Sequence, residues 1–227
     1  MWCDGAMLSS LRAFVALLAV AALLLLAGCG DSDDDTTAVD TTTSAAAAGP
    51  ELGPAFDAIA SLPGALKTPP PWPKNTATLQ QRLREIGLEP LTEEGQVSHI
   101  HQHLDIFVEG KPAEVPGDLG IGEGFISDLH THASYPPGII HVESPTDTRF
   151  TLGQFFAVWG VPLSATTLGG LSEQGDKQMR AWVDGKEVKA DPTRIILAEH
   201  QQITLTYGTE AQLPKPLPAS YTWPEGL

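Results

Sequence analysis

The chain has 227 residues, with 13 Lys and Arg against 28 Asp and Glu, which gives a formal net charge of −15 at pH 7. An acidic chain of this kind repels phosphate backbones, so no nucleic-acid partner is expected. The 22 Gly and 19 Pro exclude a bundle of long helices, while 42% hydrophobic residues suffice for the core of one domain.

The first 30 residues are typical of an export signal. Residues 13–28 form an uninterrupted apolar run of sixteen, shorter than the span of about 20 residues that crosses a bilayer. The run ends in Leu26-Ala27-Gly28-Cys29, which resembles the bacterial lipobox. We therefore predict a lipoprotein signal peptide over residues 1–28, starting at Met1 or Met7, and lipidation of Cys29. A single-pass membrane anchor is the alternative interpretation.

Residues 29–77 are predicted to be the lipidated cysteine followed by a disordered tether rich in Asp, Thr, Ala and Pro. Two acyl chains on one thiol hold a protein stably on a membrane. The expected membrane partner is therefore the lipid bilayer, reached through the anchor, with the mature protein on the extracytoplasmic face.

Residues 78–227 are predicted to form a histidine-rich, β-rich domain that ends in a proline-rich strap. Leu79, Leu83 and Ile86 follow helical spacing, and the period changes to two from Ser98 onward. Glu109-Gly110 and Asp184-Gly185 each predict a tight hairpin. Further expected elements are strands over 138–144 and 203–207 and a helix that starts at Thr151.

This element order predicts an α+β fold, a β-rich single domain resembling the β-grasp. A small β-sandwich or a barrel with one helix is the alternative. In the C-terminal strap, Tyr221 and Trp223 stand between prolines, and we expect them to pack on the sheet.

The histidines are the main functional signal, because six of the seven lie between residues 99 and 141. Two residues at i and i+2 of a strand share one face, so their imidazoles can converge on one metal ion. Three pairs have this spacing, and we predict their members as metal ligands: His101 and His103, His130 and His132, and His141 and Glu143. His99 is expected to stay outside, since three consecutive same-face imidazoles span too far for one ion, and His200 is expected at the surface.

Imidazole and carboxylate donors without thiolate favour a divalent transition metal, Zn(II) or Cu(II). The only cysteines are Cys3 and Cys29, so the predicted domain has no thiolate ligand. A metal-free network of histidine hydrogen bonds and an anion site of protonated imidazoles are the alternatives. Asp105 lies one step from His103 on the same face and is expected either to orient an imidazole or to act as a ligand.

The motifs HIHQHLDIFVEGK, LHTH, GIIHVES and TLGQFF, with a closing VDGK hairpin, resemble those of a family of uncharacterised bacterial secreted proteins and lipoproteins. The resemblance covers most of residues 79–227, and it implies no known activity.

The sequence therefore predicts a lipid-anchored domain that binds a transition metal through a cluster of histidines. One alternative is a metal-dependent enzyme that activates water, with Glu143 or Glu123 as general base. A metal-free interaction module is a further alternative. The protein partner, if the domain has one, is not predicted.

Overall fold

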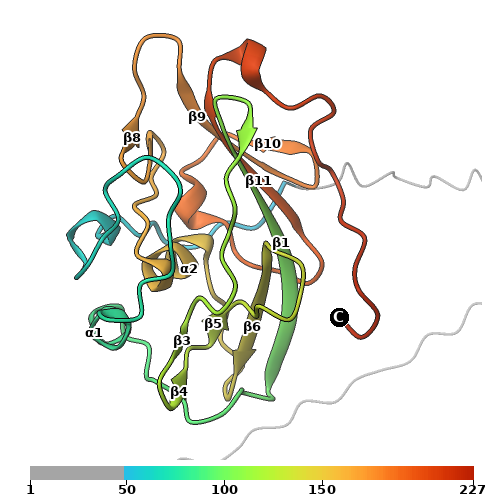
Figure 1. The fold of residues 1–227 in the computed structure, drawn as a ribbon. Helices are drawn as coiled ribbons and strands as arrows, with labels where there is room; N and C mark the ends of the chain where they lie inside the picture. Colours follow the sequence, from blue (N-terminus) through green and yellow to red (C-terminus); the bar gives the residue numbers. More distant parts are fainter. Residues whose placement is uncertain (1–48) are drawn as a thin grey trace, which may run out of the picture. The chain divides into compact units, whose positions relative to one another are not determined.

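A mixed β-sheet forms the centre of the structure (Figure 1), a computed structural model that describes residues 49–227. The strands lie side by side in the order β10 (Lys186–Val188), β9 (Gln178–Val183), β11 (Gln202–Gly208), β1 (Ser98–Val108), β6 (Ile139–Ser144) and β5 (Leu129–His130), and β2 (Lys111–Pro112) also pairs with β1. Two small hairpins complete the strands: β3 (Ile121–Gly122) with β4 (Phe125–Ile126), and β7 (Thr167–Leu168) with β8 (Leu171–Ser172). The helical elements are α1 (Leu79–Glu85), α2 (Leu152–Trp159) and three 3₁₀ turns, η1 (Ile59–Ser61), η2 (Pro192–Arg194) and η3 (Glu210–Gln212).

The strand order confirms the β-grasp-like α+β prediction. β1 and β11 are parallel neighbours at the centre of the sheet, and each has an antiparallel neighbour on its other side, β6 and β9 respectively. The chain passes from β6 to β9 through α2, which lies on one face of the sheet (Figure 1). The sandwich and barrel alternatives do not describe this single open sheet.

Both hairpin turns have the geometry that their sequences predict. Glu109 and Gly110 have φ values of 51° and 78°, and Asp184 and Gly185 have φ values of 50° and 73°. Two consecutive residues at positive φ define the type I′ turn, whose twist matches that of the flanking strands. The turns thereby set the register of β1 with β2 and of β9 with β10.

Helix α2 is apolar on nearly all sides. It begins at a capping box between Thr151 and Gln154 and ends at Gly160, which has the left-handed conformation that glycine adopts readily. Every residue of α2 except Gln154 is buried. The helix therefore needs a covering layer on the side away from the sheet.

Residues 49–77 supply this layer, which corrects the prediction that they belong to a disordered tether. Ile59 and Trp72 are both 1% exposed, and the Trp72 ring meets that of Trp159 edge to face. The backbone of Leu66 donates to the carbonyl of Gly160. The composition is loop-like, yet the segment packs because the apolar outer side of α2 requires a cover. The predicted signal peptide and Cys29 lie outside the described residues.

Arg82 joins α1 to the end of α2. Its guanidinium is buried, and it donates to the carbonyls of Val158, Asn75 and Pro63 and to the hydroxyl of Thr78. Burial lowers the pKa of Arg82 to about 10, so the group stays charged at neutral pH. A cation at this position complements the partial negative charge at the C-terminal end of α2.

The face of the sheet opposite α2 is covered by the C-terminal segment. Tyr221 stacks on His103 with ring centroids 3.6 Å apart, as the predicted strap requires, and Trp223 stacks on His200 instead of on the sheet. The central strands are consequently buried on both faces. Among residues 49–227, no helix is long and apolar enough to cross a bilayer.

Candidate metal centre

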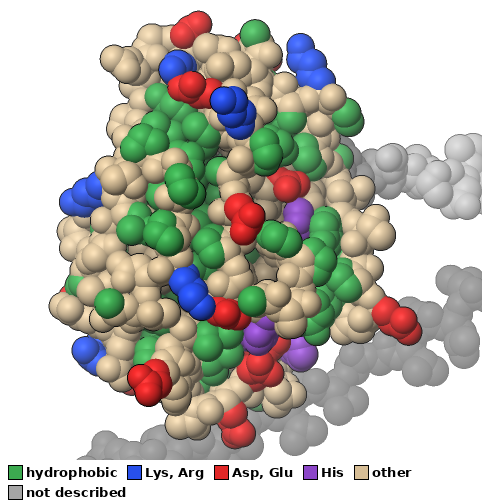
Figure 2. Space-filling view, in the orientation of Figure 1, with side chains coloured by type: hydrophobic (Ala, Val, Ile, Leu, Met, Phe, Trp, Pro, Cys, Tyr) green, Lys and Arg blue, Asp and Glu red, His purple; other side chains and the backbone are tan. Residues whose placement is uncertain are grey.

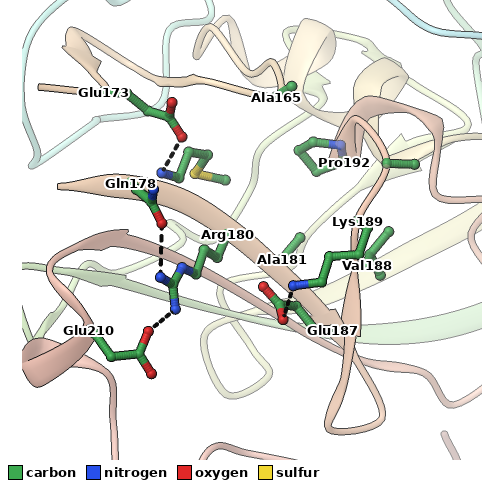
Figure 3. Close-up of a pocket in the computed structure, with 12 residues that line it drawn as sticks. Ala165, Glu173, Gln178, Arg180, Ala181, Glu187, Val188, Lys189, Pro192 and Glu210 are labelled. Carbon is green, nitrogen blue, oxygen red and sulfur yellow. Dashed lines mark hydrogen bonds and ion pairs between the residues drawn. The ribbon is translucent and has the colours of Figure 1, made fainter. Parts of the chain in front are cut away.

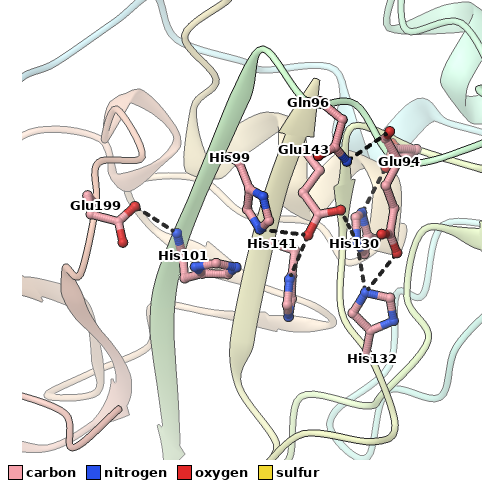
Figure 4. Close-up of polar contacts among 10 residues, drawn as sticks. Glu94, Gln96, His99, His101, His130, His132, His141, Glu143 and Glu199 are labelled. Carbon is pink, nitrogen blue, oxygen red and sulfur yellow. Dashed lines mark hydrogen bonds and ion pairs between the residues drawn. The ribbon is translucent and has the colours of Figure 1, made fainter. Parts of the chain in front are cut away.

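Strand pairing brings three histidines into one row across the sheet. His141 of β6 lies directly opposite His101 of β1 on one side and opposite His130 of β5 on the other. Glu143, two residues after His141 in β6, lies opposite His99 of β1. Because residues that pair in this way share a face, all five side chains are on one face of the sheet (Figure 4). The alternate residues Ile140 and Val142 face the core that contains α2.

Four residues form the first group, a buried cluster that could hold a metal ion: His130, His132, His141 and Glu143. Each offers a ligand atom, and these atoms all lie within 4.8 Å of one another. The Nε2 atoms of His130 and His132 are 3.1 Å apart, although β5 ends at His130. The Nδ1 atom of His141 is 3.1 Å from Oε1 of Glu143.

Several polar atoms of this cluster have no hydrogen-bond partner in the described structure. They are Nε2 of His141, Oε2 of Glu143 and, from the neighbouring strand, Nε2 of His101. His141 and Glu143 are 2% and 3% exposed. A buried polar atom without a partner costs about 1–3 kcal/mol, so these atoms point to a ligand that satisfies them.

Burial sets the protonation of the cluster. It lowers the pKa of His101 and of His130 to about 4, against the opposing charge of Glu143 in both cases, and also lowers the pKa of His132. Burial alone would raise the pKa of Glu143, but the hydrogen bond with His141 and the neighbouring imidazoles lower it to about 2. At neutral pH these groups are therefore neutral imidazoles beside a carboxylate, the forms that bind metal ions.

A second group consists of His99, His101 and Glu143. The sequence had predicted that His99 stays outside the site. The Nε2 atom of His99 lies 3.3 Å from Oε1 of Glu143, and its side chain is 48% exposed. The signal that could have identified it is the strand register, since an antiparallel pairing of His101 with His141 necessarily places His99 opposite Glu143. The register was not predicted.

His103 is the opposite case, because the structure does not bring this predicted ligand into either group. It lies opposite Ile139, so it is two residues further along β1 from the position opposite Glu143 than His101 is. Its Nδ1 is 2.9 Å from Oε1 of Gln202 and its ring stacks on Tyr221, so its polar and apolar surfaces are already in contact with protein. Asp105 contacts the same site, accepting from Nε2 of Gln202.

Two other residues also lie outside the groups. Glu123, a predicted alternative base, is exposed in the turn between β3 and β4. His200 is 45% exposed in its side chain and lies 2.8 Å from Glu199, which agrees with its predicted surface position.

Acidic side chains surround the cluster at its solvent edge. Oε1 of Glu94 is 3.4 Å from Nε2 of His132, and Oε2 of Glu199 accepts from the backbone N–H of His101 (Figure 4). Figure 2 shows histidine side chains that reach the surface beside acidic ones. Negative charge at this edge attracts cations.

A cavity of about 440 Å³ elsewhere on the domain offers no comparable chemistry (Figure 3). It is open to solvent between β9, β10 and η3. Its charged side chains already have partners: Arg180 pairs with Glu210, Lys189 pairs with Glu187, and Glu173 accepts from the backbone N–H of Met179. The histidine cluster therefore remains the candidate site.

Comparison with family models, with curated proteins and with solved structures finds no match for this chain.

Proposed function

We propose that this domain binds a divalent transition metal ion, Zn(II) or Cu(II), through the first group. The observation that carries the proposal is the convergence of four ligand atoms within 4.8 Å, together with a buried atom on each of His141 and Glu143 that has no hydrogen-bond partner among the described residues. Three imidazoles and a carboxylate match the four-coordinate preference of zinc, and nitrogen and oxygen donors also suit Cu(II).

The ligand number favours binding over catalysis. A structural or carrier site is closed by four protein ligands, whereas a catalytic zinc site keeps one position for water. The first group supplies four, and the alternative base Glu143 is itself one of them. We therefore infer a role in holding or relaying metal, with a metal-dependent enzyme as the second candidate.

We further propose that the domain acts at a membrane surface, on the extracytoplasmic side, through a lipid anchor on Cys29. This part of the proposal is supported by the Leu-Ala-Gly-Cys motif after an apolar run. The similarity of the histidine motifs to those of bacterial secreted proteins and lipoproteins agrees with it.

Metal titration of the purified chain tests the proposed site. Isothermal titration calorimetry at pH 7.5 is expected to show binding of Zn(II) or Cu(II) tighter than about 0.1 mM, a threshold near −5.5 kcal/mol. His132→Ala is expected to weaken binding strongly, because this residue supplies one of the four ligand atoms.

His200→Asn is the matched control, since it removes an exposed histidine and asparagine tolerates the φ of 57° found there. Absence of binding by the wild-type chain would favour the metal-free network and the interaction module. An effect of His200→Asn equal to that of His132→Ala would show that the site is misplaced.

A further inference from the structure

We propose that the metal centre is dinuclear, with the carboxylate of Glu143 bridging two ions. The first ion occupies the first group, and the second ion binds between His99 and His101. This inference rests on the proposed function, because it places the second ion beside the first.

The two oxygens of Glu143 face different histidines. Oε1 is 3.3 Å from Nε2 of His99 and 3.1 Å from Nδ1 of His141, whereas Oε2 is 3.8 Å from Nε2 of His130 and has no hydrogen-bond partner among the described residues. Figure 4 shows the carboxylate between the side chains of β1 and those of β5. A carboxylate in this position can give one oxygen to each of two ions, which in two-metal sites lie about 3.5–4 Å apart.

One ion cannot take all the available ligands. Atoms bound to the same ion at about 2.0–2.2 Å lie within about 4.4 Å of one another. The ligand atoms fall into two sets, in each of which all atoms lie within 4.8 Å of one another, and the two sets share only Glu143. His99 and His101 therefore need an ion of their own to act as ligands.

A purely structural role does not account for His101. The residue is 4% exposed, and its Nε2 has no hydrogen-bond partner among the described residues. The rings of His99 and His101 are in contact, with centroids 4.9 Å apart, so a nitrogen atom of each can approach one ion. A bound cation would satisfy the buried nitrogen that protein atoms leave unpaired.

The surroundings suit more than one positive charge. Besides Glu143, the carboxylates of Glu94 and Glu199 lie at opposite ends of the row of histidines, next to His132 and His101 respectively. Two divalent ions bring four charges, and neighbouring carboxylates reduce their mutual repulsion.

The two positions differ in exposure and in ligand number. The first group contributes four ligands, mostly buried, while the second contributes three, one of which is the half-exposed His99. An incomplete ligand set at the solvent edge leaves a coordination position open. We expect the second ion to bind more weakly and to exchange first.

Metal stoichiometry and magnetic coupling test the inference on the full chain purified in detergent. Equilibrium dialysis against Zn(II) at pH 7.5, followed by elemental analysis, is expected to give two ions per chain for the wild type and for His200→Asn. His99→Ala is expected to retain one. This variant changes an exposed side chain at the start of β1, so the fold should persist, and a circular dichroism spectrum checks it.

Electron paramagnetic resonance with Cu(II) adds a readout that depends on the bridge. Two Cu(II) ions about 3.5–4 Å apart are expected to give a dipole-coupled spectrum at two equivalents. The same loading of His99→Ala is expected to give an isolated Cu(II) signal, as is Glu143→Gln, since an amide does not bridge in this way.

The possible outcomes separate the two proposals. One ion in the wild type, lost in His132→Ala and unaffected by His99→Ala, would overturn the dinuclear centre and leave the proposed function intact. Two uncoupled ions, or two ions in His99→Ala, would overturn the bridging assignment. A wild-type chain without metal would overturn both proposals.

Discussion

Replacing Arg82 with methionine is expected to destabilise the domain substantially. The guanidinium donates to three backbone carbonyls, and that of Val158 belongs to the last turn of the buried helix α2. Helix ends leave carbonyls without intrahelical partners, and Arg82 supplies the partner here. Methionine retains the aliphatic packing but donates no hydrogen bond.

The magnitude follows from what each acceptor loses. Val158 is completely buried, so its carbonyl cannot bind water once Arg82 is replaced. Leaving this carbonyl without a hydrogen-bond partner costs about 1–3 kcal/mol. Loss of the cation at the end of α2 adds about 0.3–1 kcal/mol, and the partly exposed carbonyls of Asn75 and Pro63 add a similar amount. Removing the buried charge recovers part of its desolvation cost. We expect a net loss of about 2–4 kcal/mol, a large share of the usual stability of 5–15 kcal/mol.

Urea denaturation followed by tryptophan fluorescence measures this loss, because Trp72 and Trp159 are buried and contact each other, and Trp159 directly follows Val158, whose carbonyl accepts from Arg82. Arg84→Met is the matched control on the same helix, where the side chain is exposed, and should change stability by no more than about 0.5 kcal/mol. A loss below about 1 kcal/mol for Arg82→Met, with an unchanged m-value, would refute the argument that these carbonyls depend on the guanidinium.

Three further predictions concern the hairpin, the histidines and the anchor. Gly185→Val is expected to lower the free energy of unfolding by more than about 1 kcal/mol, since Gly185 has a φ of 73° and a new Cβ would lie 2.7 Å from that of Ala219. An unshifted urea midpoint would contradict this. In metal-free buffer, unfolding free energy should be constant above pH 6.5 and fall as the pH drops toward 4, by up to about 1.4 kcal/mol per pH unit for each of His101 and His130, because the unfolded chain binds their protons first. Urea titrations from pH 7.5 to 4.5 that give one constant stability would count against these lowered pKa values. Cys29→Ser should abolish partitioning into detergent or leave the precursor unprocessed, and an unchanged gel mobility together with an unchanged distribution on phase separation would exclude the lipid anchor.

The periodicity of the sequence predicted the longer strands and the hairpins at Gly110 and Gly185, because each depends on residues close in the chain, but it did not predict the two-residue strands β3, β4, β7 and β8. Alternation from Ser98 onward places His99, His101 and His103 on one face of β1, as observed. Which two of the three approach the cluster depends on β6, about 40 residues away. A shift of the pairing by two residues would exchange His99 for His103, and nothing local specifies that choice.

The extent of the domain was underestimated for a related reason. Residues 49–77 are rich in proline and have no strong periodicity, so their composition resembles that of a tether. Their packing is dictated by α2, whose sequence LGQFFAVW is apolar around the whole helix. A helix without a polar face predicts a cover on both sides, but the segment that provides the cover can be known only from the tertiary structure.

The parallel pairing of β1 with β11 also determines when this domain can fold. Residues about 100 positions apart must meet before the central strand has both neighbours, since Leu104 pairs with Ile203 and Ile106 with Leu205. Such non-local contacts slow folding and cannot form until almost the entire chain has left the ribosome. A nascent chain that ends before residue 202 would expose one edge of β1, and an unpaired strand edge of this kind is a template for pairing with another chain.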